Sequence, residues 1–342
     1  MLNSDQKLNS KLFDADAEQV SIRKGFGEGL AAAGEADTNV VGLCADLSES
    51  TYMHLFKKKF PERFVQVGVA EQNLAGVASG MAAMGKVPFM GSYAVFSPGR
   101  NWEQIRTTIC YNNVNVKIIG SHAGLSVGPD GASHQALEDF ALMRTLPRMT
   151  VISPCDAVEA KKATVAAAKM NGPVYIRLAR EKSSIVTTEE TPFEIGKAQI
   201  VWQGGRADGV GEEMEIIRAQ VGIIATGALL QKALVVARDL EAEGIVVTVI
   251  NLATIKPLDT SAVIGLAGNT GAIVTVEDHQ IAGGMGSAVA ECLAQNNPVP
   301  IEFVGVVDQF GQSGTADELF EHYGLSVSHI KEAVKKVLAR KK

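Results

Sequence analysis

Hydrophobic positions along the first half of the chain follow two alternating spacings. Short β-branched runs predict buried strands, and the longer stretches between them, with apolar residues every three or four positions, predict helices. The strand-like runs are VVGLCAD (40–46), FVQVG (64–68), VKIIGSH (116–122), MTVISP (149–154) and PVYIRLAR (173–180). This alternation predicts a parallel sheet flanked by helices.

A second alternating unit follows, with strand-like runs VGIIATG (221–227), GIVVTVINL (244–252), GAIVTVED (271–278) and PIEFVGVVD (300–308). We therefore expect an α/β protein with two consecutive three-layer α/β units and mainly parallel sheets. Residues 186–218 are polar, acidic and glycine-rich, which is typical of a linker, and 198–202 could add a small β element. The predicted organisation is a polar N-terminal extension (1–16), a first domain (17–185), this linker and a second domain (219–342).

Composition excludes several classes of protein. The chain has 342 residues, 46% of them hydrophobic, which is enough for two full cores. A net charge of −6 argues against a nucleic-acid partner. The N-terminus lacks the order of a signal peptide, and no apolar stretch approaches the ~18 residues of a membrane span. We therefore expect a cytoplasmic protein that binds neither nucleic acid nor membrane.

Cysteine and histidine spacing gives no sign of a metal site. The four cysteines are scattered without a CxxC pair and each lies in or beside an apolar stretch, which predicts buried free thiols. The six histidines are also dispersed. We expect no metal ligands in this chain.

Glu71 is the only charged residue in the segment VGVAEQNLAGVASGMAAMG (67–85). The small residues that follow it let another backbone, or a flat ligand, approach the predicted helix closely. Burial disfavours an ionised carboxylate, so we expect Glu71 to share a proton with a partner. A glutamate that interacts with the helix dipole in the first turn is the alternative, and spacing alone does not separate the two.

The segment SHAGLSVGPDGASHQALED (121–139) is a long loop at the carboxyl end of a predicted strand. Ligands bind at that edge of open α/β sheets. A single histidine there would more often be structural, but His122, Asp130 and His134 together favour a site for a polar substrate. Imidazoles and a carboxylate suit the recognition of hydroxyl and phosphate groups.

Other candidate groups have an ordinary structural explanation when each is taken alone. Tyr93 and Phe96 follow a predicted strand and could stack on a heterocycle, although buried aromatics usually belong to a core. Arg23 and Arg180 are equally consistent with solvated or paired surface charges. The glycine run at 281–291 does not match the dinucleotide-binding fingerprint, so tight packing of a helix is the better interpretation.

The order and spacing of eight segments resembles the C-terminal half of the transketolase family. These segments are RKGFGEGL (23–30), GLCADLSES (42–50), VGVAEQN (67–73), PFMGSYAVFSPGR (88–100), SHAGLSVGPDGASHQ (121–135), YIRLAR (175–180), VEDHQIAGGMGSAVAE (276–291) and DQFGQSG (308–314). The resemblance implies a pyrimidine-binding domain followed by a transketolase C-terminal domain. It also implies a transferase that moves a two-carbon ketol unit from a ketose phosphate to an aldose phosphate with thiamine diphosphate as cofactor.

The resemblance assigns the cofactor residues one by one. Glu71 matches the glutamate that hydrogen-bonds the aminopyrimidine ring nitrogen and so promotes activation of the cofactor. Tyr93 matches the aromatic residue that stacks on the pyrimidine, and Phe96 matches the next aromatic of that pocket. Asp46 matches the aspartate near the thiazolium ring. The implied catalytic residues are Glu71 and His134.

The resemblance also assigns the substrate residues. Four positions match those that hold the sugar phosphate, namely Arg23, Ser50, His122 and Arg180. Asp130 matches the carboxylate that contacts a hydroxyl of the acceptor, and His134 matches the histidine near the reacting carbon. Ser97, Pro98 and Gly99 stand where many members carry another aromatic residue, and Val127 and Pro129 also depart from the usual loop, which leaves the donor and acceptor sugars open.

Full-length members carry an N-terminal domain with a GDG-type motif that binds Mg²⁺ and the diphosphate. The 342 residues contain only GPDGAS (128–133), which lacks the asparagine of that motif. We therefore expect an N-terminal partner subunit that holds the Mg²⁺ and the diphosphate, and by analogy a homodimer of heterodimers.

Three other functions remain open at this stage. A β-type subunit of a 2-oxoacid dehydrogenase or a deoxyxylulose-phosphate synthase would share Glu71 and the two-domain layout. A non-catalytic α/β module is a second alternative, and a nicotinamide-dependent dehydrogenase is the third.

Overall fold

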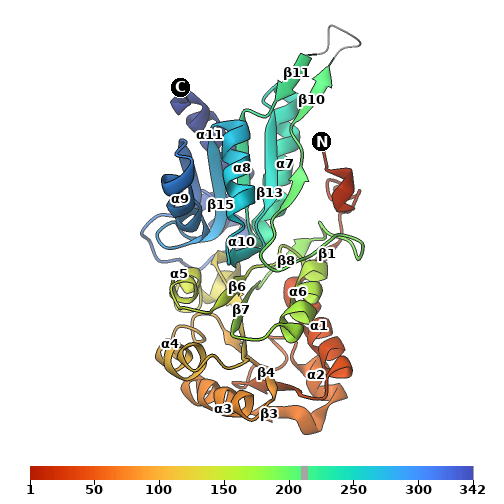
Figure 1. Cartoon of the computed structure of the whole chain (residues 1–342), viewed down its shortest axis with the longest axis vertical. Helices are drawn as coiled ribbons and strands as arrows, with labels where there is room; N and C mark the ends of the chain where they lie inside the picture. The colour runs from red at the N-terminus through yellow and green to blue at the C-terminus, as the bar shows by residue number, and fades with distance from the viewer. Residues whose placement is uncertain (209–214, 342) are drawn as a thin grey trace.

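The structure is a computed structural model that describes residues 1–208 and 215–341 (Figure 1). Two α/β units follow one another along the longest axis of the molecule, with the N-terminal unit at the lower end of the view and the second unit above it. This arrangement confirms the predicted fold class of two consecutive α/β units with mainly parallel sheets.

The first unit is built on a seven-stranded sheet in the order β14-β6-β7-β5-β4-β2-β3. Its strands are β2 (Val40–Cys44), β3 (Phe64–Gln66), β4 (Val87–Tyr93), β5 (Lys117–Ala123), β6 (Thr150–Ile152), β7 (Val174–Ala179) and β14 (Thr254–Lys256). All neighbouring pairs are parallel except β14 with β6. Strands β2 and β5 are buried along their whole length, which is why they appear in the sequence as continuous apolar runs.

Helices cover both faces of this sheet. One face packs against α1 (Ile22–Ala36), α2 (His54–Lys59) and α6 (Ala157–Lys169). The other packs against α3 (Glu71–Ala83), α4 (Trp102–Gln104), the π-helical segment η3 (Ile105–Tyr111) and α5 (Asp139–Arg144). Helices α1 and α6 approach so closely that a Cβ on Gly25 would lie 1.8 Å from the Ala157 carbonyl oxygen, so only glycine fits there.

The second unit has a five-stranded sheet in the order β16-β15-β12-β13-β9. Its strands are β9 (Gln199–Trp202), β12 (Val221–Ala225), β13 (Val247–Asn251), β15 (Ile273–Gln280) and β16 (Ile301–Val306). Only the edge strand β9 is antiparallel to its neighbour. Helices α7 (Leu230–Ala242), α10 (Ala316–His322) and α11 (Val327–Arg340) cover one face, and α8 (Thr260–Thr270) and α9 (Met285–Asn296) cover the other.

The two units share structure at their boundary. Strand β14 follows β13 in the chain but pairs with β6 of the first sheet, where Thr254 lies opposite Ile152. One hydrophobic cluster contains Phe140 of the first unit together with Ile224 and Leu266 of the second. The units are therefore joined by both a sheet and a core.

The N-terminal residues and the predicted linker are also part of this framework. Leu12, within the predicted polar extension, is buried against the second unit. Strand β1 (Gln19–Ser21) pairs with β8 (Lys182–Ser184). The small β element expected in the linker is β9, and beyond it β10 (Gly205–Asp208) pairs with β11 (Glu215–Arg218). Residues 209–214 of the linker lie outside the described residues, and the domain boundaries stay predictions.

All four cysteines are free and buried, as the sequence predicts. In the part of the chain that the structure describes, no helix combines the length and apolar character needed to cross a membrane.

Candidate active site

Glu71 is the first residue of α3, and its side chain is only 1% exposed. The buried hydroxyl of Ser92, on β4, donates to Oε1 at 3.0 Å, and the guanidinium of Arg100 donates to Oε2 at 2.9 Å. The amide of Asn101 donates to the main-chain oxygen of Glu71 at 2.9 Å. Both carboxylate oxygens are therefore fixed by residues of the first unit, and one of them faces a cation.

Arg100 is a residue that the sequence analysis did not single out. It lies at the end of the segment PFMGSYAVFSPGR, and nothing in its spacing indicates that it returns to Glu71. Its side chain is half exposed, and its guanidinium carbon lies 4.8 Å from the centre of the Phe96 ring. Arg100 thus connects the buried carboxylate with the aromatic residues of the site.

Tyr93 and Phe96 form the aromatic part of the site. Tyr93 ends β4 and Phe96 lies in the turn that follows, and their rings are stacked with centres 6.3 Å apart. Neither ring belongs to the core, because both side chains remain partly exposed. They offer aromatic faces beside Glu71 to a flat ligand.

Two histidines complete this cluster. The ring of His122 lies 3.9 Å from that of Tyr93, and the ring of His134 lies 5.4 Å from that of Phe96. His122 has a φ of 53°, a left-handed conformation that is uncommon outside glycine. His122, near the end of β5, and His134, in the loop that follows, therefore both lie against the aromatic rings.

His122 is held as a neutral ring. Burial, with smaller effects from Arg23 and Arg180, lowers the pKa of His122 to about 3. Arg23 Nη1 lies 3.3 Å from His122 Nε2, and because a guanidinium only donates, Nε2 must accept. The proton then resides on Nδ1, which lies 2.8 Å from Ser121 Oγ.

Arg23, Ser50 and Arg180 lie beside His122. Arg23 Nη1 donates to the Ser50 carbonyl oxygen at 2.6 Å, and Nη2 donates to the Arg180 carbonyl oxygen at 2.7 Å. Among the described residues, the buried Nε of Arg23 has no hydrogen-bond partner. Arg180 Nη1 donates to the Val127 carbonyl oxygen at 3.1 Å and to Glu181 at 2.8 Å. These groups form a cationic region next to the histidines, with one buried donor unsatisfied.

The two predicted aspartates are less closely connected to the other residues. Asp46 follows β2 with a φ of 62°, and its main-chain N–H donates to Gln66 at 2.7 Å. Asp130 ends the 3-10 helix η4 (Leu125–Asp130), and both side chains are exposed. Within residues 1–208 and 215–341, neither carboxylate hydrogen-bonds to another predicted site residue.

No cluster of three or more histidine, cysteine, aspartate or glutamate residues that could hold a metal ion occurs within the described chain. The glycine run at 281–291 serves close packing of α9 on β15, because a Cβ added to Gly284 would lie 2.2 Å from Oε2 of Glu277 and one added to Gly286 would lie 2.6 Å from Oγ1 of Thr275. Glu277 also accepts hydrogen bonds from the N–H groups of Met285 and Gly286 at the start of α9.

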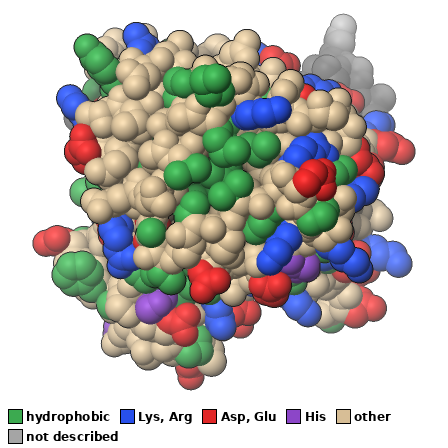
Figure 2. Space-filling view, turned by 90° about the horizontal axis from the view of Figure 1, so that it is seen from below, with side chains coloured by type: hydrophobic (Ala, Val, Ile, Leu, Met, Phe, Trp, Pro, Cys, Tyr) green, Lys and Arg blue, Asp and Glu red, His purple; other side chains and the backbone are tan. Residues whose placement is uncertain are grey.

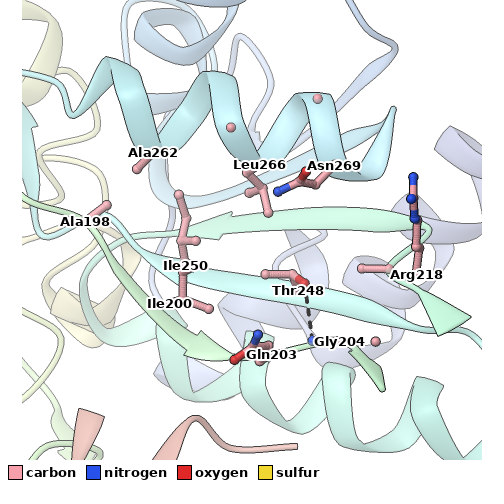
Figure 3. Close-up of a pocket in the computed structure, with 14 residues that line it drawn as sticks. Ala198, Ile200, Gln203, Gly204, Arg218, Thr248, Ile250, Ala262, Leu266 and Asn269 are labelled. Atoms are coloured by element: carbon pink, nitrogen blue, oxygen red, sulfur yellow. Dashed lines mark hydrogen bonds between the residues drawn. The ribbon is translucent and has the colours of Figure 1, made fainter. Parts of the chain in front are cut away.

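A separate cavity of about 700 Å³ lies in the second unit, between α8 and strands β9 and β13 (Figure 3). Ile200, Ile250 and Leu266 contribute apolar side chains, and Arg218 lies at one end of it. The cavity contains none of the predicted site residues. Tyr93 and His122 lie instead at the carboxyl ends of β4 and β5 in the first unit.

Comparison with known proteins identifies the family. Residues 18–184 match the transketolase pyrimidine binding domain, and residues 213–330 match the transketolase C-terminal domain. A protein described as a transketolase C-terminal section, from Methanocaldococcus jannaschii, is 43% identical over 92% of this chain and 95% of its own length. The 6-deoxy-6-sulfo-D-fructose transketolase subunit SqwH of Clostridium sp. (strain MSTE9) is 38% identical over 96% of this chain and 98% of its own length.

A solved structure of a split-gene transketolase, described as an inactive β4 tetramer, has a TM-score of 0.85 and 44% sequence identity. The match covers 94% of this chain and all of that one. The two domain matches occur in the expected order. The relatives, at this identity and coverage, point to the same family. The chain belongs to the transketolase family.

Proposed function

We propose that this chain is the C-terminal subunit of a split transketolase, which uses thiamine diphosphate to transfer a two-carbon ketol unit from a ketose phosphate to an aldose phosphate. The observation that carries the proposal is a continuous path of side chains. It runs from the buried carboxylate of Glu71 through Arg100 and Phe96 to Tyr93, and from Tyr93 through His122 to the half-buried guanidinium of Arg23. One end of this path suits a heterocyclic cofactor, and the other suits an anionic sugar.

The residues at the first end fit the pyrimidine of thiamine diphosphate. Glu71 would hold a proton at the ring nitrogen, and the faces of Tyr93 and Phe96 would stack on the ring. The Arg100 guanidinium is half exposed, so it can turn toward solvent and leave Oε2 of Glu71 to the ring nitrogen. When bound, thiamine diphosphate supplies a nucleophilic carbon and an electron sink. Asp46, whose side chain is exposed, would lie near the thiazolium ring.

The residues at the second end fit a sugar with an anionic group. Arg23 has an unsatisfied buried N–H that can donate to a phosphate oxygen, supported by Ser50, His122 and Arg180. His134 and Asp130 belong to the same loop and would contact hydroxyl groups of the sugar, with His134 nearer the reacting carbon. Both ring nitrogens of His122 are already engaged, Nε2 with Arg23 and Nδ1 with Ser121, so His122 would support the phosphate site by orienting Arg23. Because its ring stays neutral, it adds no charge.

A surface of the first unit supports the proposal of a partner subunit. On α3, a Cβ added to Gly76 or Gly80 would meet no atom within 4 Å, and nearby Val69 and Met84 are 74% and 84% exposed. Figure 2 views the molecule from the end that carries α3 and shows hydrophobic side chains gathered at the middle of this face. Apolar patches of this kind are typical of protein interfaces.

The partner would be the N-terminal transketolase subunit, which holds the diphosphate and Mg²⁺. The names of two relatives support this view, because one is a C-terminal section and the other a subunit. The tetramer of a single chain type formed by the split-gene relative is described as inactive. We propose a homodimer of heterodimers in the cytoplasm, active only when both subunits are present.

The cationic region suits either a phosphate or a sulfonate as the anionic group of the natural sugar. The relative from Clostridium sp. is named for 6-deoxy-6-sulfo-D-fructose, whose sulfonate is also a tetrahedral anion. The assay should therefore offer both kinds of ketose donor with an aldose phosphate acceptor.

The experiment that tests the function is turnover by the two purified subunits with thiamine diphosphate and Mg²⁺. We expect ketose consumption, with formation of a ketose two carbons longer than the acceptor aldose, only in the mixture. The Glu71→Gln variant in the same mixture is the matched control and should be inactive. Pyruvate consumption without ketol transfer would instead identify a subunit of a 2-oxoacid enzyme, and it would contradict the proposal.

A further inference from the structure

The segment 121–139, called the loop here, includes the last residues of β5 and carries His122, Asp130 and His134. It is attached near its start to the second unit. Oδ1 of Asp278, near the end of β15, accepts a hydrogen bond from the Leu125 main-chain N–H at 2.9 Å. Gly124 has a φ of 81° and lies so close that an added Cβ would be 1.9 Å from Oδ2 of Asp278. The carboxylate thus lies directly against the backbone that follows His122.

The end of the loop is attached to the same place. Arg177 Nε donates to Asp139 Oδ2 at 2.9 Å, and its Nη2 donates to the main-chain oxygen of Asp278 at 2.6 Å. The Phe140 N–H donates to Nε2 of His279 at 3.1 Å. Two adjacent residues of β15 therefore contact both ends of the loop.

The middle of the loop has a third attachment. The side-chain amide of Gln135, next to His134, donates to the Gln312 carbonyl oxygen at 3.0 Å. Gly311 leaves room for it, since an added Cβ would be 1.8 Å from Oε1 of Gln135. All three attachments come from the second unit, which itself contains none of the predicted site residues.

Asp278 differs from an ordinary surface carboxylate. Burial raises its pKa, while Arg177 and the N–H groups of Leu125 and Ser126 oppose that change. A buried acceptor of this kind is costly to leave unpaired, so its position and that of the loop backbone are mutually fixed.

We infer that Asp278 is a positioning residue of the sugar-binding loop: its carboxylate fixes the backbone at Leu125 and thereby the left-handed conformation of His122 beside Arg23. The second unit thus sets the geometry of sugar binding from outside the site. The geometric part of the inference stands on the contacts of this chain, and its consequence for sugar affinity rests on the proposed function.

Glu277 provides a matched control. It precedes Asp278 on β15 and is also buried. Its Oε2 and Oε1 accept from the N–H groups of Met285 at 2.6 Å and Gly286 at 2.8 Å, within the second unit. Glu277→Gln therefore changes a buried carboxylate without touching the loop backbone.

The first test uses the purified chain alone and measures amide hydrogen exchange in residues 121–139. We expect Asp278→Ala to speed amide exchange at Leu125 at least tenfold. Asp278→Asn should have a smaller effect because it keeps one acceptor oxygen. Glu277→Gln should leave exchange at Leu125 unchanged. Asp278→Asn preserves the volume of the side chain and replaces the alanine variant as the test if that variant does not fold. Unchanged exchange in a folded Asp278 variant would overturn the inference.

The second test measures the KM for the ketose phosphate and the Kd for thiamine diphosphate in the two-subunit complex. We expect Asp278→Asn to raise KM about tenfold and to leave the cofactor Kd unchanged, with Glu277→Gln unchanged in both. Faster exchange with an unchanged KM would overturn the positioning role. If the wild-type complex transfers no ketol unit, the proposed function fails, and the exchange experiment still decides whether Asp278 fixes the loop.

Discussion

The two ends of the candidate site are held in different ways. Glu71 is fixed by Ser92, Arg100 and Asn101, which lie 21 to 30 positions away in the same unit. The loop after His122 is fixed by Asp278, which is 153 positions from Leu125 and belongs to the other unit. The proposed cofactor end, around Glu71, is therefore held within one unit, whereas the proposed sugar end, around His122, depends on how the two units are assembled.

The largest effect should come from changing the cofactor end. Glu71→Gln removes an ionisable group and keeps the shape of the side chain, so we expect turnover to fall by about 10²–10⁴-fold while the thermal unfolding temperature changes little. Steady-state assays with the partner subunit and a thermal melt of the variant are the measurements. Turnover near that of the wild type would remove Glu71 from the proposed chemistry.

A change at the sugar end should act on substrate affinity instead. Arg23→Ala removes charge-assisted hydrogen bonds worth about 1.5–3 kcal/mol each, so we expect KM for a phosphorylated ketose to rise by about 10–100-fold. The cofactor Kd should stay the same. An uncharged ketose is the control: an equal rise in its KM would show that Arg23 does not act through the anionic group.

His134 is assigned to the sugar end but lies beside the ring of Phe96, so it tests where the two ends meet. His134→Ala should weaken sugar handling by about tenfold and cofactor binding much less, because we assign its imidazole to the sugar hydroxyl groups. Parallel measurements of KM and of the cofactor Kd separate these effects. Lost cofactor binding with unchanged sugar affinity would place His134 at the cofactor end.

A smaller effect concerns stability in acid, through His279 at the contact between the units. Burial lowers its pKa to about 4, whereas the unfolded chain binds this proton near pH 6.5. Its contribution to the free energy of unfolding is therefore complete above pH 6.5 and is lost as pH falls toward 4. In urea unfolding, the free energy of unfolding of the His279→Gln variant should decrease less between pH 7 and pH 5 than that of the wild type.

The pH dependence of the unfolding free energy must be compared between the wild type and His279→Gln, because other buried groups change stability with pH in the opposite direction. Burial raises the pKa of Glu277 to about 8, so its contribution decreases as pH rises above 4.5. An identical decrease in wild type and variant between pH 7 and pH 5 would mean that His279 does not carry the acid dependence.

Much of the fold could be predicted because its strands are buried on both faces and therefore appear as continuous apolar runs. Strand β14 could not, since its three residues carry no local sign that they leave the second unit and pair with β6. The predicted positions of Tyr93 and His122 meet in space because β4 and β5 are adjacent parallel strands that end at the same edge.

The residues that the sequence analysis missed are those whose role depends on contacts distant in the chain. Arg100 carries no motif of its own, and its pairing with Glu71 depends on the path of the turn after Phe96. Asp278 lies within a segment that supported the family resemblance, but only the packing of the two units brings its carboxylate to Leu125. The roles of Asp46 and Asp130 stay predictions.

The central claim is that this chain carries half of a cofactor site. The most direct test is titration calorimetry of thiamine diphosphate into each subunit alone and into their mixture. We expect weak or undetectable binding to either subunit alone, and tight, Mg²⁺-dependent binding at one cofactor per pair in the mixture, lowered by Glu71→Ala. Tight binding to this chain alone, or none in the mixture, would contradict the account.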